Sequence, residues 1–282
     1  MSQRDPKSIL IAVEGIDGTG KSSAVPVIEE ICQRCGYDTL TTREPYTQEV
    51  IDLVHSSQKG NLCEAMIRDR VQHLHDVILP HLSKSKSVVI TDRYFYSNVA
   101  YNADEVPPEK ILEEHRERGI PDADILVLLD MPVRVAQQRI MKTRGFLDPI
   151  EKRSMTQARK LFRSMANKHP CAVIVDASKP LEIVHEELLQ KMVRVLRVRK
   201  IESELEDLED SMFPCKLIYT ETRKQKRDTP YCVSLRRVQA GRSSHPPTSP
   251  LDRITQTLNL QKVPCVLQPK GPLQVIPRYR PC

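Results

Sequence analysis

The sequence predicts an α/β fold in which a five-stranded parallel sheet is flanked by helices. Two observations predict this fold class. Short apolar runs alternate with helix-compatible segments over residues 1–198, as expected for a parallel sheet covered on both faces. Polar and charged side chains follow the ends of several of these runs. Because ligands of such sheets gather at the carboxyl ends of the strands, we expect a binding site at that edge.

The first predicted strand, residues 9–13, leads into the most informative segment of the chain. A helix-compatible segment, residues 22–35, follows that segment. Between them lie four residues that fit the pattern G-x-x-x-x-G-K-[ST] at every required position, namely Gly15, Gly20, Lys21 and Ser22. A strand, a glycine-rich turn and a helix in this order predict a phosphate-binding loop, and hence a sheet of the P-loop NTPase type.

The loop predicts binding of ATP or another nucleoside triphosphate together with Mg²⁺. A glycine-rich turn at a helix N-terminus directs several backbone N–H groups at one anion. We expect Lys21 to reach the β- and γ-phosphates and the Ser22 hydroxyl to bind Mg²⁺. The predicted nucleotide-binding residues of the loop are Gly15, Asp17, Gly18, Thr19, Gly20, Lys21, Ser22 and Ser23. The loop alone fits ATPases, GTPases and small-molecule kinases equally well.

The other elements are predicted from apolar runs and helical spacing. The further predicted strands are residues 39–42, 87–91, 125–130 and 171–176. The further predicted helices are residues 63–83, 133–141, a segment beginning near Leu161, and 181–198. The second strand ends in Thr42-Arg43-Glu44-Pro45 and the third in Asp92-Arg93-Tyr94. These endings place several charged side chains at the carboxyl edge of the sheet.

The chain changes in character after residue 198. Residues 199–212 are acidic with apolar residues at helical spacing, which predicts a helix. Residues 213–282 are rich in proline and hold 13 Lys+Arg against 3 Asp+Glu, a net charge of +10, whereas residues 1–212 hold 30 against 34. We expect this basic extension to be poorly ordered.

No membrane segment or signal peptide is predicted. The sequence has no apolar run of about 18 residues, which a transmembrane helix needs, and its first residues lack an apolar signal core. We therefore expect an intracellular, cytoplasmic protein without membrane contact.

Five stretches between residues 8 and 198 resemble, in the same order, those of thymidylate kinases. They are Glu14-Gly-Ile-Asp-Gly-Thr-Gly-Lys-Ser22, Thr42-Arg-Glu-Pro45, Asp69-Arg70, Asp92-Arg-Tyr-Phe-Tyr-Ser97 with Ala100-Tyr101, and Arg144-Gly145 followed by Asp176-Ala-Ser178. The resemblance implies transfer of a phosphoryl group from ATP, with Mg²⁺, to a pyrimidine deoxynucleoside monophosphate, with dTMP favoured. The family's tendency to dimerise implies that a homodimer is one possible state.

The resemblance also implies how the acceptor is bound. Arg43, Arg70 and Arg93 are expected to grip the acceptor monophosphate, because the arginine fork matches phosphate oxygens. Asp17 is expected to bind the 3′-hydroxyl of the acceptor sugar. The resemblance further implies that Met66, Ser97 and Tyr101 contact the nucleoside, and that Asp92 lies near Mg²⁺ or the acceptor phosphate.

The segment 138–151 resembles the mobile lid of the family. Members of the family carry a helper arginine either in the phosphate-binding loop or in the lid. The loop position after Asp17 is Gly18, so the resemblance implies that Arg144 of the lid supplies it. Arg139 is expected to lie against the adenine. The expected catalytic residues are therefore Lys21, Asp92, Arg93 and Arg144.

Three positions differ from the family pattern. Met66 stands where a phenylalanine usually stacks on thymine, and Pro149 follows Asp148 where the lid usually has an arginine. Asn102 stands where a glutamine is frequent. These differences leave dUMP, UMP and CMP as alternative acceptors.

Two other functions remain open from the sequence. The chain could be a catalytically weak nucleotide-binding scaffold whose basic extension contacts nucleic acid or an acidic partner. It could also be a deoxynucleoside kinase, since those enzymes carry a similar Asp-Arg pair after a strand. The Thr-Arg-Glu-Pro run and the position of Asp17 favour the monophosphate kinase.

Overall fold

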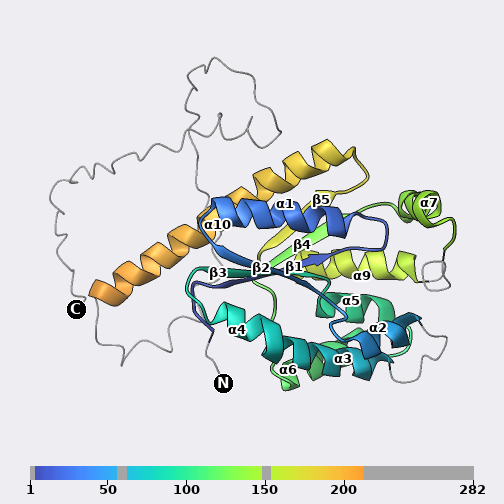
Figure 1. The fold of residues 1–282 in the computed structure, drawn as a ribbon, viewed down its shortest axis with the longest axis horizontal. Helices are drawn as coiled ribbons and strands as arrows, with labels where there is room; N and C mark the ends of the chain where they lie inside the picture. The colour runs from blue at the N-terminus through green and yellow to red at the C-terminus, as the bar shows by residue number, and fades with distance from the viewer. Residues whose placement is uncertain (1–3, 56–61, 148–153, 213–282) are drawn as a thin grey trace, which may run out of the picture. The chain divides into compact units, whose positions relative to one another are not determined.

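The protein contains a five-stranded parallel sheet with the strand order β2-β3-β1-β4-β5 in a computed structural model (Figure 1). The structure describes residues 4–55, 62–147 and 154–212, without the side chains of His55 and 200–212. The strands are β1 (Ile9–Glu14), β2 (Asp38–Arg43), β3 (Ser87–Asp92), β4 (Ile125–Asp130) and β5 (Ala172–Asp176). The predicted fold class is confirmed, and each strand lies within two residues of its predicted bounds.

The three central strands are buried along nearly their whole length. All six residues of β1 are buried, as are the first five residues of β3 and of β4. Strands covered on both faces are expected to be continuous apolar runs, which is why the sequence predicted them well. Parallel pairing aligns Val13 of β1 and Arg43 of β2 with Asp92 of β3. The charged ends of three strands therefore meet at one edge.

Helices cover both faces of the sheet. Figure 1 shows α1 and α10 on one face and α3, α4, α5 and α9 on the other. The helices are α1 (Lys21–Arg34), α2 (Gln48–His55), α3 (Leu62–His73), α4 (Leu79–Leu82), α5 (Phe95–Asn102), α6 (Pro108–Glu117), α7 (Val133–Arg144), α9 (Met155–Lys168) and α10 (Leu181–Met212). A π-helical turn, η1 (Leu74–Ile78), joins α3 to α4, so the predicted helix 63–83 is one run of three parts.

The predicted boundary after residue 198 does not interrupt the backbone, because α10 is a single helix from Leu181 to Met212. Arg199 attaches this helix to the sheet, since its Nη2 donates to the carbonyl oxygen of Asp124, 3.0 Å away. Residues 148–153 of the predicted lid and the basic extension 213–282 lie outside the described residues. Among the described residues, no helix combines the length and the apolar character that crossing a membrane requires.

Candidate active site

The phosphate-binding loop is a tight turn in which three glycines have positive φ. The φ angles are +149° at Gly15, +80° at Gly18 and +90° at Gly20, a region that side-chain-bearing residues rarely adopt. At two of these positions there is also no room for a side chain. A Cβ at Gly15 would lie 2.5 Å from the carbonyl oxygen of Leu129, and one at Gly18 would lie 2.8 Å from that of Ala136. The curl therefore depends on glycine, as the sequence predicts.

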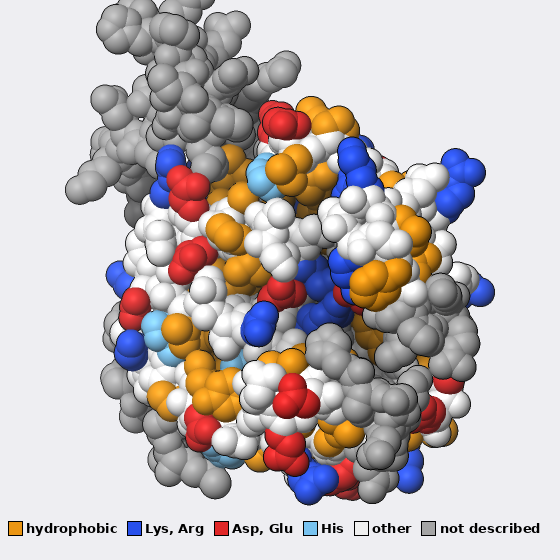
Figure 2. Space-filling model, turned by 45° about the vertical axis from the view of Figure 1, so that its right-hand side comes forward, with side chains coloured by type: hydrophobic (Ala, Val, Ile, Leu, Met, Phe, Trp, Pro, Cys, Tyr) orange, Lys and Arg blue, Asp and Glu red, His pale blue; other side chains and the backbone are white. Residues whose placement is uncertain are grey.

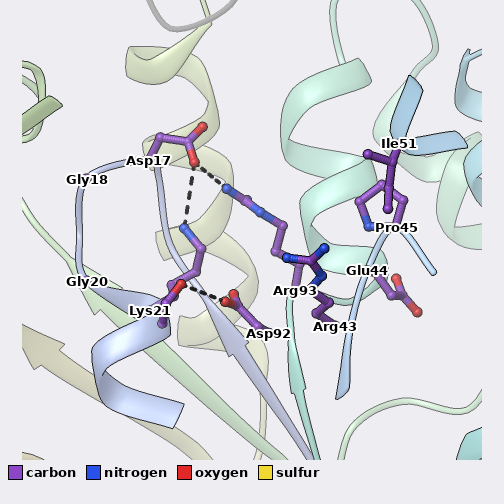
Figure 3. Close-up of a pocket in the computed structure, with 11 residues that line it drawn as sticks. Asp17, Gly18, Gly20, Lys21, Arg43, Glu44, Pro45, Ile51, Asp92 and Arg93 are labelled. Carbon is purple, nitrogen blue, oxygen red and sulfur yellow. Dashed lines mark hydrogen bonds and ion pairs between the residues drawn. The ribbon is translucent and has the colours of Figure 1, made fainter. Parts of the chain in front are cut away.

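A cavity of about 330 Å³ lies at the carboxyl edge of β1, β2 and β3 (Figure 3). Its lining residues are Asp17, Gly18, Gly20, Lys21, Ser22, Arg43, Glu44, Pro45, Ile51, Asp92 and Arg93. The face shown in Figure 2 is hollowed near its centre, and Lys and Arg side chains gather there. Eight of the lining residues belong to the set expected from the sequence, and they come from three separate strand ends.

Lys21, the first residue of α1, is folded back into the loop. Its Nζ donates to the carbonyl oxygens of Gly15 and Ile16, at 2.9 and 3.1 Å. Burial, together with the nearby charge of Arg93, lowers the pKa of Lys21 to about 8, and Asp17 is among the groups that oppose this shift. A bound polyanion would stabilise the charged ammonium and raise this pKa again.

Asp17 and Arg93 join the loop to the end of β3. Figure 3 shows the two side chains directed at one another, and Arg93 Nη2 forms an ion pair with Asp17 Oδ1. Although burial opposes it, the positive charges of Arg93, Lys21 and Arg144 hold the pKa of Asp17 below its usual range. The Tyr101 hydroxyl lies 3.5 Å from Asp17 Oδ2, and Arg93 Cζ lies 5.7 Å from the centroid of its ring.

Ser22 and Asp92 present oxygen atoms on the floor of the cavity. The Ser22 hydroxyl donates to Asp92 Oδ2 at 3.2 Å. Asp92 Oδ1 is buried and has no hydrogen-bond partner among the described residues. Mg²⁺ prefers hydroxyl, carboxylate and water oxygens, so this donor set, with one buried carboxylate oxygen left over, fits Mg²⁺.

The other predicted nucleotide-binding residues surround the loop. Thr19 is buried and its hydroxyl donates to the carbonyl oxygen of Ile16 at 2.8 Å, while Ser23 is exposed in the first turn of α1. Arg139 on α7 donates from Nη2 to the carbonyl oxygen of Lys179 at 3.4 Å, which brings α7 to the β5–α10 loop. Arg144 is the last residue of α7 and is exposed.

Arg70 lies outside the lining of the cavity. It was expected to grip the acceptor phosphate with Arg43 and Arg93, but it is completely buried and does not line the cavity. Its Nε donates to Glu44 Oε2 at 2.7 Å, its Nη2 lies 2.5 Å from the same oxygen, and its Nη1 donates to His115 Nε2 at 2.7 Å. The guanidinium group thus contacts Glu44, which lines the cavity, and His115, which does not.

The expected nucleoside contacts do not line the cavity either. Ser97 is buried, and its hydroxyl donates to Glu14 Oε2 at 2.7 Å. Met66 on α3 and Tyr101 on α5 are half-buried, and neither is a lining residue. Two of the three contact residues that do line the cavity: Tyr101 contacts Asp17 and Arg93, and Ser97 Oγ accepts from Arg93 Nη1 at 3.2 Å.

Sequence reasoning missed Glu14, although a signal was present. Glu14 is the one charged residue in the buried strand β1 and is fully inaccessible to solvent. Burial raises its pKa to about 7, while Ser97, Arg93 and Lys21 act in the opposite direction. A charged residue at the end of an otherwise apolar run is the signal that could have identified it. The contacts of Arg70 with Glu44 and His115 leave no comparable signal in the sequence, because 70 residues lie between Glu44 and His115.

Comparison with known proteins agrees with this geometry. The family model for thymidylate kinase matches residues 13–188. The chain therefore belongs to the thymidylate kinase family.

Curated relatives support this assignment over almost their whole length. A probable thymidylate kinase of Archaeoglobus fulgidus is 35% identical over 197 residues, which cover 68% of this chain and 98% of the relative. A thymidylate kinase of Xylella fastidiosa is 32% identical, covering 69% and 91%, and a probable thymidylate kinase of Pyrococcus horikoshii is 32% identical, covering 65% and 95%. The protein is thus a nucleoside monophosphate kinase, and the recognised resemblance is confirmed.

Proposed function

We propose that this member of the thymidylate kinase family transfers the γ-phosphoryl group of ATP to dTMP, giving ADP and dTDP for nucleotide biosynthesis. One observation carries the proposal. A single cavity is lined on one side by the phosphate-binding loop and on the other by Arg43 and Arg93, and the Asp17–Arg93 ion pair joins the two sides. Such an arrangement suits a reaction between two phosphorylated molecules.

The loop side of the cavity binds the donor. Backbone N–H groups of the loop and of the start of α1 surround the ATP phosphates. The Lys21 ammonium gives up its hydrogen bonds to Gly15 and Ile16 and contacts the β- and γ-phosphates instead. Ser22 and Asp92 would hold Mg²⁺, which neutralises charge on the phosphate oxygens when it is bound. Arg139, whose Nη2 donates to the carbonyl oxygen of Lys179, would lie against the adenine.

The strand side of the cavity binds the acceptor. Arg93 exchanges part of its contact with Asp17 for the phosphate of dTMP, and Arg43 approaches it from the end of β2. Asp17 is then available to bind the 3′-hydroxyl of the sugar. Tyr101, Met66 and Ser97 would contact the nucleoside, and Arg70 would act through Glu44, with which it forms an ion pair.

These residues promote the reaction by positioning the two substrates and by stabilising negative charge on the phosphate oxygens. Phosphoryl transfer proceeds in line, with negative charge spread over the equatorial oxygens of the transferred group. Arg43 and Arg93 hold the attacking oxygen in line and offset its repulsion from ATP, while Lys21 and Arg144 stabilise the charge that develops. Exclusion of water by the segment that carries Arg144 limits hydrolysis of ATP.

The proposal is tested with a panel of acceptors. The protein is incubated with ATP, Mg²⁺ and dTMP, dUMP, UMP or CMP, and formation of the diphosphate is measured. We expect dTMP to give the highest kcat/KM, and Lys21→Ala and Arg93→Ala to lower it by at least about 100-fold, as for loss of a charge in the transition state. Lys84→Ala, which removes an exposed lysine paired with Asp38, is the matched control. Binding of ATP without phosphorylation of any of the four acceptors would refute the proposal.

We also propose that the basic extension 213–282 binds polyanions such as single-stranded nucleic acid. Its net charge of +10 stands against −4 for the rest of the chain, and this asymmetry is the observation that supports it. The extension would then act separately from the kinase reaction.

A further inference from the structure

We propose that Glu14 is a positioning residue for Arg93, which it holds both through the Ser97 hydroxyl and through the backbone that carries Arg93. The inference rests on the proposed function, in which Arg93 binds the acceptor phosphate. Glu14 does not line the cavity itself, so its effect must pass through Arg93.

The first connection is a chain of side-chain hydrogen bonds with a defined direction. Arg93 Nη1 donates to Ser97 Oγ at 3.2 Å, and Ser97 Oγ donates to Glu14 Oε2 at 2.7 Å. Arginine can only donate, and the serine hydroxyl has a single proton. Ser97 must therefore accept from Arg93 and give its own proton to Glu14, which requires an acceptor at residue 14.

The second connection is through the backbone. Arg93 has φ of +71°, a conformation that costs on the order of 1 kcal/mol for a residue with a side chain. The residue is held on both sides, because its N–H donates to the carbonyl oxygen of Val13 at 3.0 Å and the Thr91 hydroxyl donates to its carbonyl oxygen at 2.6 Å. Directly after it, the Tyr94 N–H donates to Glu14 Oε1 at 2.8 Å.

Glu14 also takes the place of a capping residue for α5. Tyr94 is the N-cap of this helix, and no side-chain cap hydrogen bond forms at that position. Glu14 Oε1 accepts instead from the N–H groups of Tyr94 and Ser97, at 2.8 and 3.2 Å. The end of β1, immediately before the phosphate-binding loop, thereby fixes the start of the helix that follows Arg93.

The surroundings of Glu14 agree with a role in position rather than in simple packing. Lys21 of α1 and Arg93 are the charged groups that act on it, and Ser97 and the Tyr94 N–H are its donors. Burying a carboxylate at a strand end costs free energy, whereas an apolar side chain could pack there without that cost. Here its two oxygens accept three hydrogen bonds, all from residues that adjoin or contact Arg93.

The first test compares the steady-state kinetics for dTMP with those for ATP. Glu14→Gln keeps the size of the side chain but replaces one oxygen by a donor, so Ser97 loses its acceptor or the helix loses its cap. We expect KM for dTMP to rise or kcat/KM for dTMP to fall by roughly 10- to 100-fold, with KM for ATP changed by less than about threefold. Ser97→Ala interrupts the same chain and should act in the same direction. Ser87→Ala, a buried serine at the start of β3 that donates to Lys84, is the matched control.

A double-mutant cycle then asks whether Glu14 acts through Arg93. Glu14→Gln is measured in the parent and in Arg93→Ala, and we expect it to lower kcat/KM for dTMP in the parent but by less than about twofold in the Arg93→Ala background. Equal losses in both backgrounds, or equal losses for ATP and dTMP, would overturn the inference. If Arg93→Ala itself leaves KM and kcat for dTMP unchanged, the proposed role of Arg93 fails instead. Should Glu14→Gln not fold, the cycle is run with Ser97→Ala and is judged by the same outcomes.

Discussion

Gly18 lies where the phosphate-binding loop passes close to α7. With φ of +80°, a Cβ at this position would lie 2.8 Å from the carbonyl oxygen of Ala136 and 3.0 Å from Ile140 Cγ1. The sequence interpretation used Gly18 as a residue of the glycine-rich loop and as a sign that the helper arginine comes from elsewhere. The structure adds a steric reason, because the backbone of α7 occupies the space that a side chain would need.

This contact gives a prediction for Gly18→Ala and Gly18→Arg. Both should lower kcat by at least about tenfold, because the loop must shift away from α7 and its N–H groups no longer converge. Gly18→Arg should also fail to restore activity to Arg144→Ala. The measurement is kcat together with thermal unfolding of each variant.

The matched control is Gly119→Ala, because Gly119 has φ of +69° but open space around its Cβ position. It carries the same kind of backbone strain without the clash, so it should lower stability slightly and leave kcat unchanged. Unchanged kcat in Gly18→Ala would show that contact with α7 does not constrain the loop.

At the scale of elements, a buried polar cluster joins the end of β2 to α3 and α6. Glu44 follows β2, Arg70 and His73 lie on α3, and His115 lies on α6. Glu44 Oε1 lies 3.2 Å from His73 Nδ1, while its other oxygen faces Arg70. Because Glu44 lines the cavity together with Arg43 and Pro45, the cluster holds this part of the cavity wall in place.

The cluster predicts how stability depends on pH. His115 Nδ1 donates to the carbonyl oxygen of Ile111 at 2.6 Å, which leaves Nε2 to accept from Arg70 and requires a neutral ring. Burial, together with the charge of Arg70, lowers the pKa of His115 from 6.5 to about 4. The folded protein therefore binds fewer protons than the unfolded chain between these values.

The stabilisation from neutral His115 is complete above pH 6.5 and is lost as the pH falls through about 4. We expect the free energy of unfolding to fall by on the order of 1–3 kcal/mol more in the parent than in His115→Gln over this range. Urea unfolding at several pH values measures it. Parallel pH profiles for the two proteins would contradict the assigned tautomer.

Element prediction succeeded where local sequence decides the outcome. The five strands follow from apolar runs that are buried on both faces. The short helices α2, α5 and α6 were not predicted. The starts of α2 and α5 depend on distant residues. The start of α5 is capped by Glu14, and the turn before α2 is held by Asp69, which accepts hydrogen bonds from the Tyr46 and Thr47 N–H groups at 2.7 Å each.

At the scale of the whole molecule, the kinase fold and the basic extension differ in composition. The family match covers residues 13–188, and the net charge of +10 resides in residues 213–282. These observations favour independent roles for the two parts.

Truncation after residue 212 tests this independence. We expect kcat and KM for dTMP to stay within about twofold of the full chain, because no described site residue is removed. Binding of single-stranded DNA at low salt should be lost, since its strength depends on the number of cationic side chains. Retained DNA binding by the truncated chain, or a large fall in kcat/KM, would contradict separate roles.

The sequence by itself determined the sheet, the phosphate-binding loop and the family, because each rests on short-range patterns: apolar runs, glycine spacing and motif order. It also named Asp17, Arg43 and Arg93, which line the cavity. Only the tertiary structure decided that Arg70 contacts Glu44 and His115, and that Glu14 caps α5 beside Arg93. The physical reason is that a buried charge takes its partners from whatever elements the fold packs against it, and sequence separation carries no information about that packing.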